Sequence, residues 1–358
     1  MPLLRAIHRW LGLVLAAVWG LQAITGLMLV FHWELDDATV RGPAGPLVPA
    51  VFGRTLDAIT LSHPGDAVSA VYASAGRPGR FDVMLARPDG HQDVLRVDGR
   101  GEVLRARPAD HDFAHIGVFQ IATYLHQTLF AHQWGTWLIG MSGVILLSNL
   151  AVALRLAWPR PGLWRRALLP GPTRGARAGI FAWHRGVGLW LVAPAAVMIG
   201  AGVVMAFANP LSRWPDAARP APAANLAAVG APTRFADAVS LALNRYPRAA
   251  FWAAETPSPG SPWFKVEIRQ PGEWRRAQGT TALYVADRGG RLLADYDALK
   301  NPLPTRVWDS LYAIHTGEAA GVVGRVFALL VGAWLLTIVV LGLWLWAVRR
   351  PSRTQERS

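Results

Sequence analysis

The chain has 358 residues, and its 36 Lys and Arg against 23 Asp and Glu give a formal net charge of +13. Charged residues make up only 16% and hydrophobic residues 52% of the sequence, which excludes an ordinary soluble domain and favours a membrane protein. No cysteine is present, so disulfides, thiolate-bound zinc, iron–sulfur clusters and covalently attached c-type haem are excluded. The basic residues flank apolar stretches, which argues against nucleic acid as a partner.

Four stretches are long enough to cross a bilayer, which takes about 20 apolar helical residues. Free of Asp, Glu, Lys and Arg, they are Trp10–Trp33, His126–Leu154, Gly186–Ser212 and Val326–Val348. The alternative interpretation of the first stretch is a cleaved secretory signal peptide. The stretch is longer than the apolar region of such a peptide, however, and it ends without a small-residue cleavage site. We therefore expect four transmembrane helices.

The charges around these stretches predict their orientation. The loop between the second and third stretches carries arginines and no acidic residue, and the tail after the fourth is also rich in arginine. Because positive charge in short loops marks the cytoplasmic side, both termini are expected in the cytoplasm. The two long connections are then periplasmic, and the setting is a bacterial inner membrane.

Matching residues predict that the chain is a duplicated unit. Each copy opens with His-Arg followed by Gly-Leu, and later carries a His followed by two glycines at equal spacings. The matches are His8, Arg9 and Gly12 with His184, Arg185 and Gly188, then His126, Gly135 and Gly143 with His315, Gly324 and Gly332. The offset between copies grows only inside the loops. A pseudo-twofold axis along the membrane normal is expected to relate the copies.

Each long connection is predicted to form a small α+β module, with a helix followed by hairpins. The first module has its helix at Thr55–Leu61 and strands at Phe81–Ala86, Val94–Val97 and Val103–Leu104. The second has its helix at Phe235–Leu243 and strands at Phe264–Ile268, Ala282–Ala286 and Arg291–Leu293. The predicted order is transmembrane helix 1–33, module 34–125, transmembrane helix 126–157, basic loop 158–183, transmembrane helix 184–212, module 213–314, transmembrane helix 315–348 and tail 349–358.

Several motifs together resemble the PepSY-associated transmembrane helix family. They are the His-Arg-x-x-Gly-Leu opening, the second stretch reading His-Gln-Thr-Leu-Phe from His126, the ending Gly-Leu-Trp-Leu-Trp before Arg-Arg-Pro, and the intervening helix-plus-hairpin modules. The resemblance implies similarity to iron-regulated proteins of the bacterial inner membrane, among them haem-containing ferric-siderophore reductases.

Four histidines belong to the repeat, and their predicted positions decide which can meet. His8 and His184 begin stretches on the cytoplasmic side, whereas His126 and His315 begin the returning stretches on the periplasmic side. The pseudo-twofold axis brings each histidine to its repeat mate, and most of a bilayer separates the two pairs. Two neutral imidazoles are suitable axial ligands for haem iron, so two b-type haems are predicted. The alternative is that these histidines are interfacial polar residues.

Other candidate residues surround these pairs. Arg9 and Arg185 follow the cytoplasmic histidines and are candidates to bind haem propionates, although positive-inside placement explains them equally well. His32 and His132 lack repeat mates and are expected near the periplasmic ends of the first two helices. They are an alternative ligand pair, or else they line a substrate entrance.

The favoured prediction is transmembrane electron transfer to a periplasmic acceptor, which the family resemblance suggests is a ferric siderophore. No Gly-x-Gly-x-x-Gly or phosphate-binding loop is present, so a separate cytoplasmic reductase or a membrane quinol must supply electrons. One alternative is a haem-free protein whose modules bind peptide or regulate a partner. Another is a component of siderophore transport, although the apolar stretches hold no carboxylate that would support it.

Overall fold

The computed structural model describes residues 1–108, 117–211, 222, 229–274 and 278–348. The predicted tail 349–358 lies outside them. The chain divides into two compact units. The helical unit comprises residues 1–30, 122–210 and those from 314 onward, and the sheet unit comprises 31–121 and 211–313.

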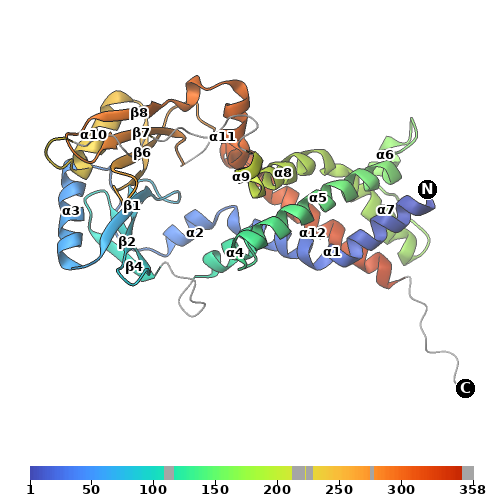
Figure 1. Ribbon diagram of the computed structural model, residues 1–358. Helices are drawn as coiled ribbons and strands as arrows, with labels where there is room; N and C mark the ends of the chain where they lie inside the picture. The colour runs from blue at the N-terminus through green and yellow to red at the C-terminus, as the bar shows by residue number, and fades with distance from the viewer. Residues whose placement is uncertain (109–116, 212–221, 223–228, 275–277, 349–358) are drawn as a thin grey trace, which may run out of the picture. The chain divides into compact units, whose positions relative to one another are not determined.

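Long apolar helices build the helical unit (Figure 1). Within the described residues, α1 (Pro2–Leu29), α5 (His132–Ala157) and α12 (Gly321–Ala347) are each long and apolar enough to cross a membrane. A fourth crossing requires that α7 (Ala176–Trp190) and α8 (Val192–Ala206) together form one span, although they bend by 62°. Helix α1 packs against α5 and α12, and α5 packs against α8.

The bend between α7 and α8 lies within the third predicted span, where Pro194 by itself predicts a kink. Leu191 leaves the helical conformation, with φ −120° and ψ 14°. Pro194 follows three residues later, and it has no N–H to donate to the carbonyl of Trp190. Its ring also crowds that carbonyl, so the helix breaks in the turn before the proline. As a result His184 lies on α7 rather than on the apolar helix that follows.

The second and fourth spanning helices also begin later than the predicted 126 and 315. Their predecessors, α4 (Val118–Gln127) and α11 (Leu303–Thr316), end first, and the chain breaks before α5 and α12. In the first break Leu129, Phe130 and His132 have positive φ, and in the second Gly317 and Gly321 do. The short helices η2 (Glu318–Ala320), α6 (Trp164–Leu168) and α9 (Ala208–Leu211) complete this unit and its border. The first break lies in an uncharged stretch, so composition did not reveal it, whereas the second contains Gly317 and Glu318.

The sheet unit contains one antiparallel sheet of eight strands in the order β4-β3-β2-β1-β5-β6-β7-β8. The strands are β1 (Ala67–Ala73), β2 (Arg80–Ala86), β3 (Gln92–Asp98), β4 (Val103–Pro108), β5 (Ala250–Glu255), β6 (Trp263–Arg269), β7 (Thr281–Ala286) and β8 (Leu292–Tyr296). The first strand of each half, β1 or β5, was not predicted from the sequence. These two strands pair with each other, with Val71 opposite Ala254. The expected separate modules are therefore halves of one sheet.

Two helices, α3 (Pro49–Ser62) and α10 (Phe235–Arg245), pack against each other over the sheet. Their aromatic side chains Phe52 and Phe235 are buried in one core with Val71, Val266 and Leu283 from the strands. Because this core draws on both halves of the sheet, the two halves form a single hydrophobic unit. The 3-10 turn η1 (Ala298–Lys300) follows the last strand.

A buried ion-pair cluster ties α2 (His32–Ala38) to the sheet. The Asp37 side chain is only 2% exposed and pairs with Arg80 of β2 and Arg96 of β3, which are 1% and 3% exposed. Asp36 pairs with Arg96 and with Arg105. Burial raises the pKa of the Asp36 carboxyl, but the hydrogen bond from Arg105 and the nearby arginine charges outweigh this and leave the pKa below its ordinary value. The charged form of the Asp36 carboxyl is thus favoured.

Candidate functional site

The structure brings together the first predicted histidine pair, which we call the inner pair. His8 lies on α1 and His184 on α7, and their ring centres are 6.1 Å apart with the planes inclined by 49°. His8 Nδ1 lies 3.0 Å from Oδ1 of Asn149, a side chain of α5. Gly342 of α12 leaves room for the other ring, since a Cβ there would lie 3.3 Å from Cε1 of His184.

The second predicted pair, the outer pair, has nearly the same geometry. His126 lies in the last turn of α4 and His315 in that of α11, and their ring centres are 6.1 Å apart with the planes inclined by 40°. His315 Nδ1 donates a hydrogen bond to the carbonyl of Met198, at 2.8 Å. Because a carbonyl can only accept, the proton is on Nδ1 and the lone pair of His315 is on Nε2.

The hydrogen bonds of His126 lead to the same tautomer. Its Nδ1 lies 3.0 Å from the Thr25 hydroxyl, which itself donates to the carbonyl of Leu21 at 2.8 Å. With its proton used in that bond, the hydroxyl accepts from Nδ1 of His126. The outer histidines therefore both present Nε2 as the basic nitrogen.

Two glycines that match in the repeat make space for the outer rings. A Cβ on Gly26 would lie 3.1 Å from Cε1 of His126, and one on Gly202 would lie 2.7 Å from Cε1 of His315. The second distance is shorter than real side chains show, so only glycine fits there without displacing the ring. Each outer histidine thus packs against a bare stretch of backbone on α1 or α8.

Another glycine pair lets the chain fold back after each outer histidine. A Cβ on Gly135 would lie 1.6 Å from the carbonyl oxygen of Thr128, and one on Gly324 would lie 2.1 Å from that of Gly317. Any side chain at either position would push away the connection that carries the histidine. These close contacts give a physical reason for glycines that the sequence analysis noted only as repeat matches.

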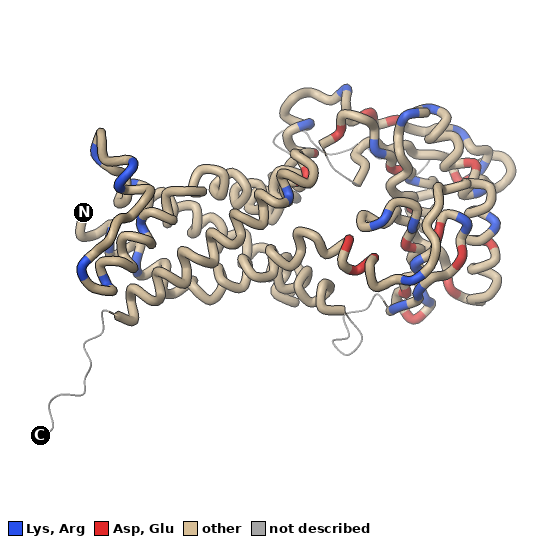
Figure 2. The backbone as a smooth tube through the Cα atoms, turned by 180° about the vertical axis from the view of Figure 1, so that it is seen from behind, with Lys and Arg blue, Asp and Glu red and all other residues tan. Residues whose placement is uncertain are grey.

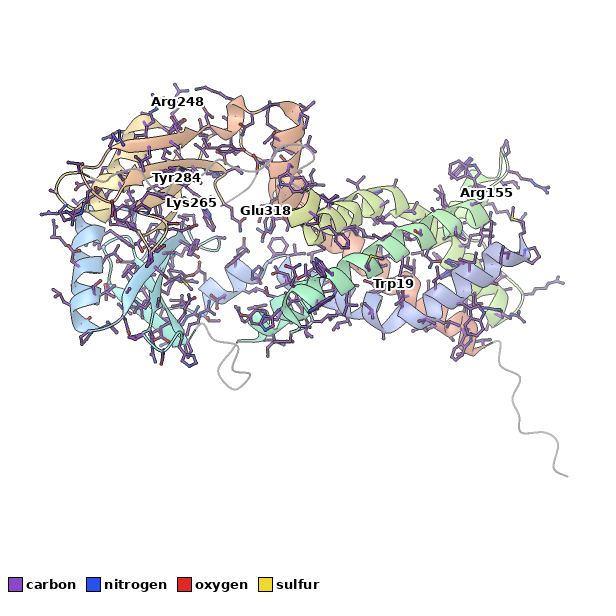
Figure 3. All side chains as sticks on the ribbon, viewed as in Figure 1. Trp19, Arg155, Arg248, Lys265, Tyr284 and Glu318 are labelled. Carbon is purple, nitrogen blue, oxygen red and sulfur yellow. The ribbon has the colours of Figure 1, made fainter. Side chains whose placement is uncertain are left out.

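A cavity of about 460 Å³ surrounds the inner pair. Its walls are mainly apolar and come from α1, α5, α7, α8 and α12, and Trp19 lies on them. Figure 3 shows Trp19 inside the helical unit. Arg5, Arg9 and Arg185 also line the cavity. In Figure 2 the basic residues of the helical unit gather mainly at the end where the N-terminus lies, and the rest of its helices carry few charges.

A family model for the PepSY-associated TM region matches residues 5–349. The chain belongs to this family. The match includes both histidine pairs and both units, and it identifies the protein as a membrane protein. No curated protein matches the chain.

The arginines of this PepSY-associated protein have different surroundings at the inner cavity. Arg185 donates from Nε and Nη2 to the carbonyl of Ala157, at 3.2 and 3.0 Å. The Arg9 guanidinium lies over Trp10, 5.5 Å from the ring centre. Arg5 and Asn149 are not among the site residues predicted from the sequence. An amide in the second half of an uncharged stretch was the signal that could have found Asn149, because a polar group in lipid needs a partner.

The other two candidate histidines belong to different surroundings. His32 begins α2 in the sheet unit, where its ring centre lies 4.2 Å from that of Trp33 and 6.2 Å from that of Phe119. His132 is exposed at the start of α5, in the helical unit. The ring facing His126 is that of His315, so the outer pair is formed without either of them.

The donor atoms of this family member favour one kind of metal. Among the described residues no group of three or more His, Cys, Asp or Glu is placed to hold a metal ion. Zinc sites take three or four protein ligands, whereas haem iron takes four nitrogens from the porphyrin and needs axial ligands only. Pairs of histidines therefore fit a metal that brings its own equatorial ligands.

Proposed function

We propose that this PepSY-associated protein transfers electrons across the membrane through two b-type haems, one at each histidine pair, to a ferric siderophore on the outer side. The observation that carries the proposal is the equal 6.1 Å separation of the two pairs. Metal–imidazole bonds are about 2.0 Å, and a ring nitrogen lies about 1.1 Å from the ring centre, so imidazoles on opposite sides of one metal have centres about 6.2 Å apart. Both pairs match this separation.

The tautomers support the same assignment. Metal-bound histidine usually donates its second ring N–H to a neighbouring acceptor, which fixes the ring and strengthens the ligand. His315 and His126 donate from Nδ1 to Met198 and Thr25, which leaves Nε2 for iron. Imidazoles that are already oriented lose less entropy when they bind a metal.

The inner cavity has the size and lining for such a group. Cofactor sites of about 300–1,000 Å³ with apolar walls and a few polar groups are typical, and this cavity of about 460 Å³ lies in that range. Arg5, Arg9 and Arg185 would form charge-assisted hydrogen bonds to the propionates. When bound, haem iron accepts and gives up one electron at a time, which is the chemistry that the side chains of the protein lack.

The direction of transfer follows from the topology that we propose. The arginine-rich end of the helical unit lies in the cytoplasm of a bacterium, so the inner pair is at the inner face of the cytoplasmic membrane. A quinol or a separate cytoplasmic reductase supplies the electrons there, and the sheet unit lies in the periplasm. Hard oxygen ligands hold Fe(II) far less well than Fe(III), so reduction of a siderophore complex releases its iron.

A duplicated unit accounts for the pairing of the histidines. The two halves of the sheet have the same order, a helix followed by four strands. In the helical unit, a Cβ on Gly143 would meet Val203 at 2.5 Å, and one on its repeat mate Gly332 would meet Leu27 at 2.9 Å. Equivalent contacts in both halves are what an approximate twofold axis produces.

Reduction of ferric chelates tests this function. In purified protein reduced with dithionite and freed of excess reductant, several ferric siderophores are expected to speed haem reoxidation under anaerobic conditions. The gallium complexes of the same siderophores have the same shape and charge but accept no electron, so they should leave the spectrum unchanged. Reoxidation no faster with any ferric complex than with buffer would refute the siderophore as acceptor. Protein that contains no haem after expression with ample haem would favour the haem-free binding or regulatory role instead.

Filling the space at Gly202 is expected to remove the outer haem alone. In Gly202→Leu, side-chain atoms occupy the place of the His315 ring, so that ring turns away from His126. About half of the haem should be lost, with the inner haem unchanged in its spectrum. Gly200 on the same helix has open space at its Cβ position, and Gly200→Leu is the matched control that keeps both haems. Full haem content in Gly202→Leu would contradict the outer site.

A further inference from the structure

The two inner histidines have different neighbours on the helices that face them. His8 Nδ1 lies 3.0 Å from Oδ1 of Asn149, and Asn149 is only 4% exposed. The repeat places Ile338 at the position equivalent to Asn149, and Ile338 lines the same cavity. The second half of the chain thus has an apolar side chain at the position where the first half has Asn149.

Burial makes the Asn149 amide an expensive group unless it is hydrogen-bonded. Leu146 and Leu150, its neighbours on α5, are also buried, and the helix around it is apolar. An amide moved from water to an apolar site without a hydrogen-bond partner loses its bonds to water and gains none in exchange. The hydrogen bond to His8 is the contact at this position that offsets the cost.

The same contact selects the tautomer of His8. The side-chain oxygen of asparagine can only accept a hydrogen bond, so with Oδ1 facing Nδ1 the proton is on Nδ1 and the lone pair of His8 is on Nε2. An acceptor on the second nitrogen also makes a ligating imidazole a stronger donor to its metal. We propose that Asn149 is a positioning residue that fixes the Nδ1-protonated tautomer of His8 and so strengthens His8 Nε2 as a ligand for iron. This inference rests on the proposed function.

Removing the acceptor should weaken haem binding at the inner pair. Loss of such an outer-shell partner typically costs 10–100-fold in metal affinity, and we expect that range for Asn149→Leu, which keeps the size of the side chain. A stronger imidazole donor stabilises Fe(III) more than Fe(II), so its loss raises the reduction potential. If only the oxidised protein loses affinity for haem, each tenfold loss raises the reduction potential by about 59 mV for this one-electron couple.

The experiment compares three variants of the full-length protein in detergent. Asn149→Leu removes the acceptor, Asn149→Asp keeps an acceptor oxygen in the same place, and Ile338→Leu is the matched control on the equivalent wall of the cavity. Haem affinity of the inner pair is measured by titration of haem-free protein, in a Gly202→Leu background so that the outer pair does not contribute. The reduction potential is measured on the loaded protein. In haem-free protein labelled with ¹⁵N-histidine, the ¹⁵N shifts of His8 report its tautomer directly.

The expected result is Nδ1-protonated His8 in the wild type, in Asn149→Asp and in Ile338→Leu, with loss of this state in Asn149→Leu. Asn149→Leu should also bind haem 10–100-fold more weakly at a higher potential, and Asn149→Asp should have a lower potential than the wild type. Equal ¹⁵N shifts and equal haem affinity in the wild type and Asn149→Leu would overturn the role of Asn149 and leave the proposed function intact. If Asn149→Leu does not fold, an unchanged potential in Asn149→Asp overturns the role. A wild-type protein that binds no haem would overturn the proposed function itself.

Discussion

Replacing either member of a histidine pair by alanine is expected to remove the haem of that pair and leave the other in place. His8→Ala and His184→Ala should give one spectrum, and His126→Ala and His315→Ala another, because the two rings of each pair lie 6.1 Å apart and are proposed to hold one haem together. Each variant should retain about half of the wild-type haem, measured as pyridine haemochrome per protein. Combining one variant from each pair should abolish the Soret band.

The other two candidate histidines provide the controls. His32 packs against Trp33 in the sheet unit, and His132 is exposed at the start of α5. His32→Ala and His132→Ala should therefore keep the full haem content. Loss of haem in His132→Ala but not in His315→Ala would show that the outer ligands are assigned wrongly. Loss of both haems in a single variant of either pair would contradict two independent sites.

The largest loss of stability is expected when the buried carboxylate of α2 is removed. Asp37 pairs with the buried side chains of Arg80 and Arg96. It also accepts hydrogen bonds from the Ser74 hydroxyl and from the backbone N–H of Arg77, both at 2.5 Å. In Asp37→Ala two guanidinium groups would remain in the interior with fewer partners for their charge. Removing one partner of a buried ion pair costs about 3–5 kcal/mol, and we expect that loss in the unfolding free energy of the sheet unit.

Thermal unfolding of the full-length protein, followed by circular dichroism in the β-sheet region, measures this effect. Arg245→Gln is the matched control, because Arg245 pairs with Asp295 while its own side chain is 58% exposed. Such exposed pairs contribute about 1 kcal/mol or less, so the transition should move little. Equal shifts for Asp37→Ala and Arg245→Gln would mean that the buried cluster does not stabilise the sheet unit.

The ion-pair cluster of α2 should make the sheet unit less stable in acid. The pKa of Asp36 lies below its ordinary value in the folded protein. A carboxyl with a lowered pKa contributes stability above its ordinary pKa, and that contribution is lost as the pH falls through the folded value. The stability of the sheet unit should therefore fall as the pH is lowered from 3.8, the ordinary pKa of an aspartate, through the lower pKa of folded Asp36. Thermal unfolding at a series of pH values measures this fall.

Sequence by itself determined the membrane class, the family and the residues that meet at each pair. Long uncharged stretches are expensive outside lipid, so hydropathy predicts them directly. The predicted repeat paired His8 with His184 and His126 with His315, because equivalent positions in two copies are expected to meet across a symmetry axis. In the structure these are the rings that lie 6.1 Å apart.

Only the tertiary structure decided how these parts combine. The pairing of β1 with β5 joins the two modules into one sheet, and it depends on backbone hydrogen bonds between strands far apart in the chain, which no local pattern records. The break before α5 lies in uncharged sequence that predicts a continuous helix. The contact of Asn149 with His8 joins residues of two helices, and its selection of one tautomer depends on which atoms face each other in the folded state. Composition and spacing describe single elements, whereas these features arise from contacts between elements.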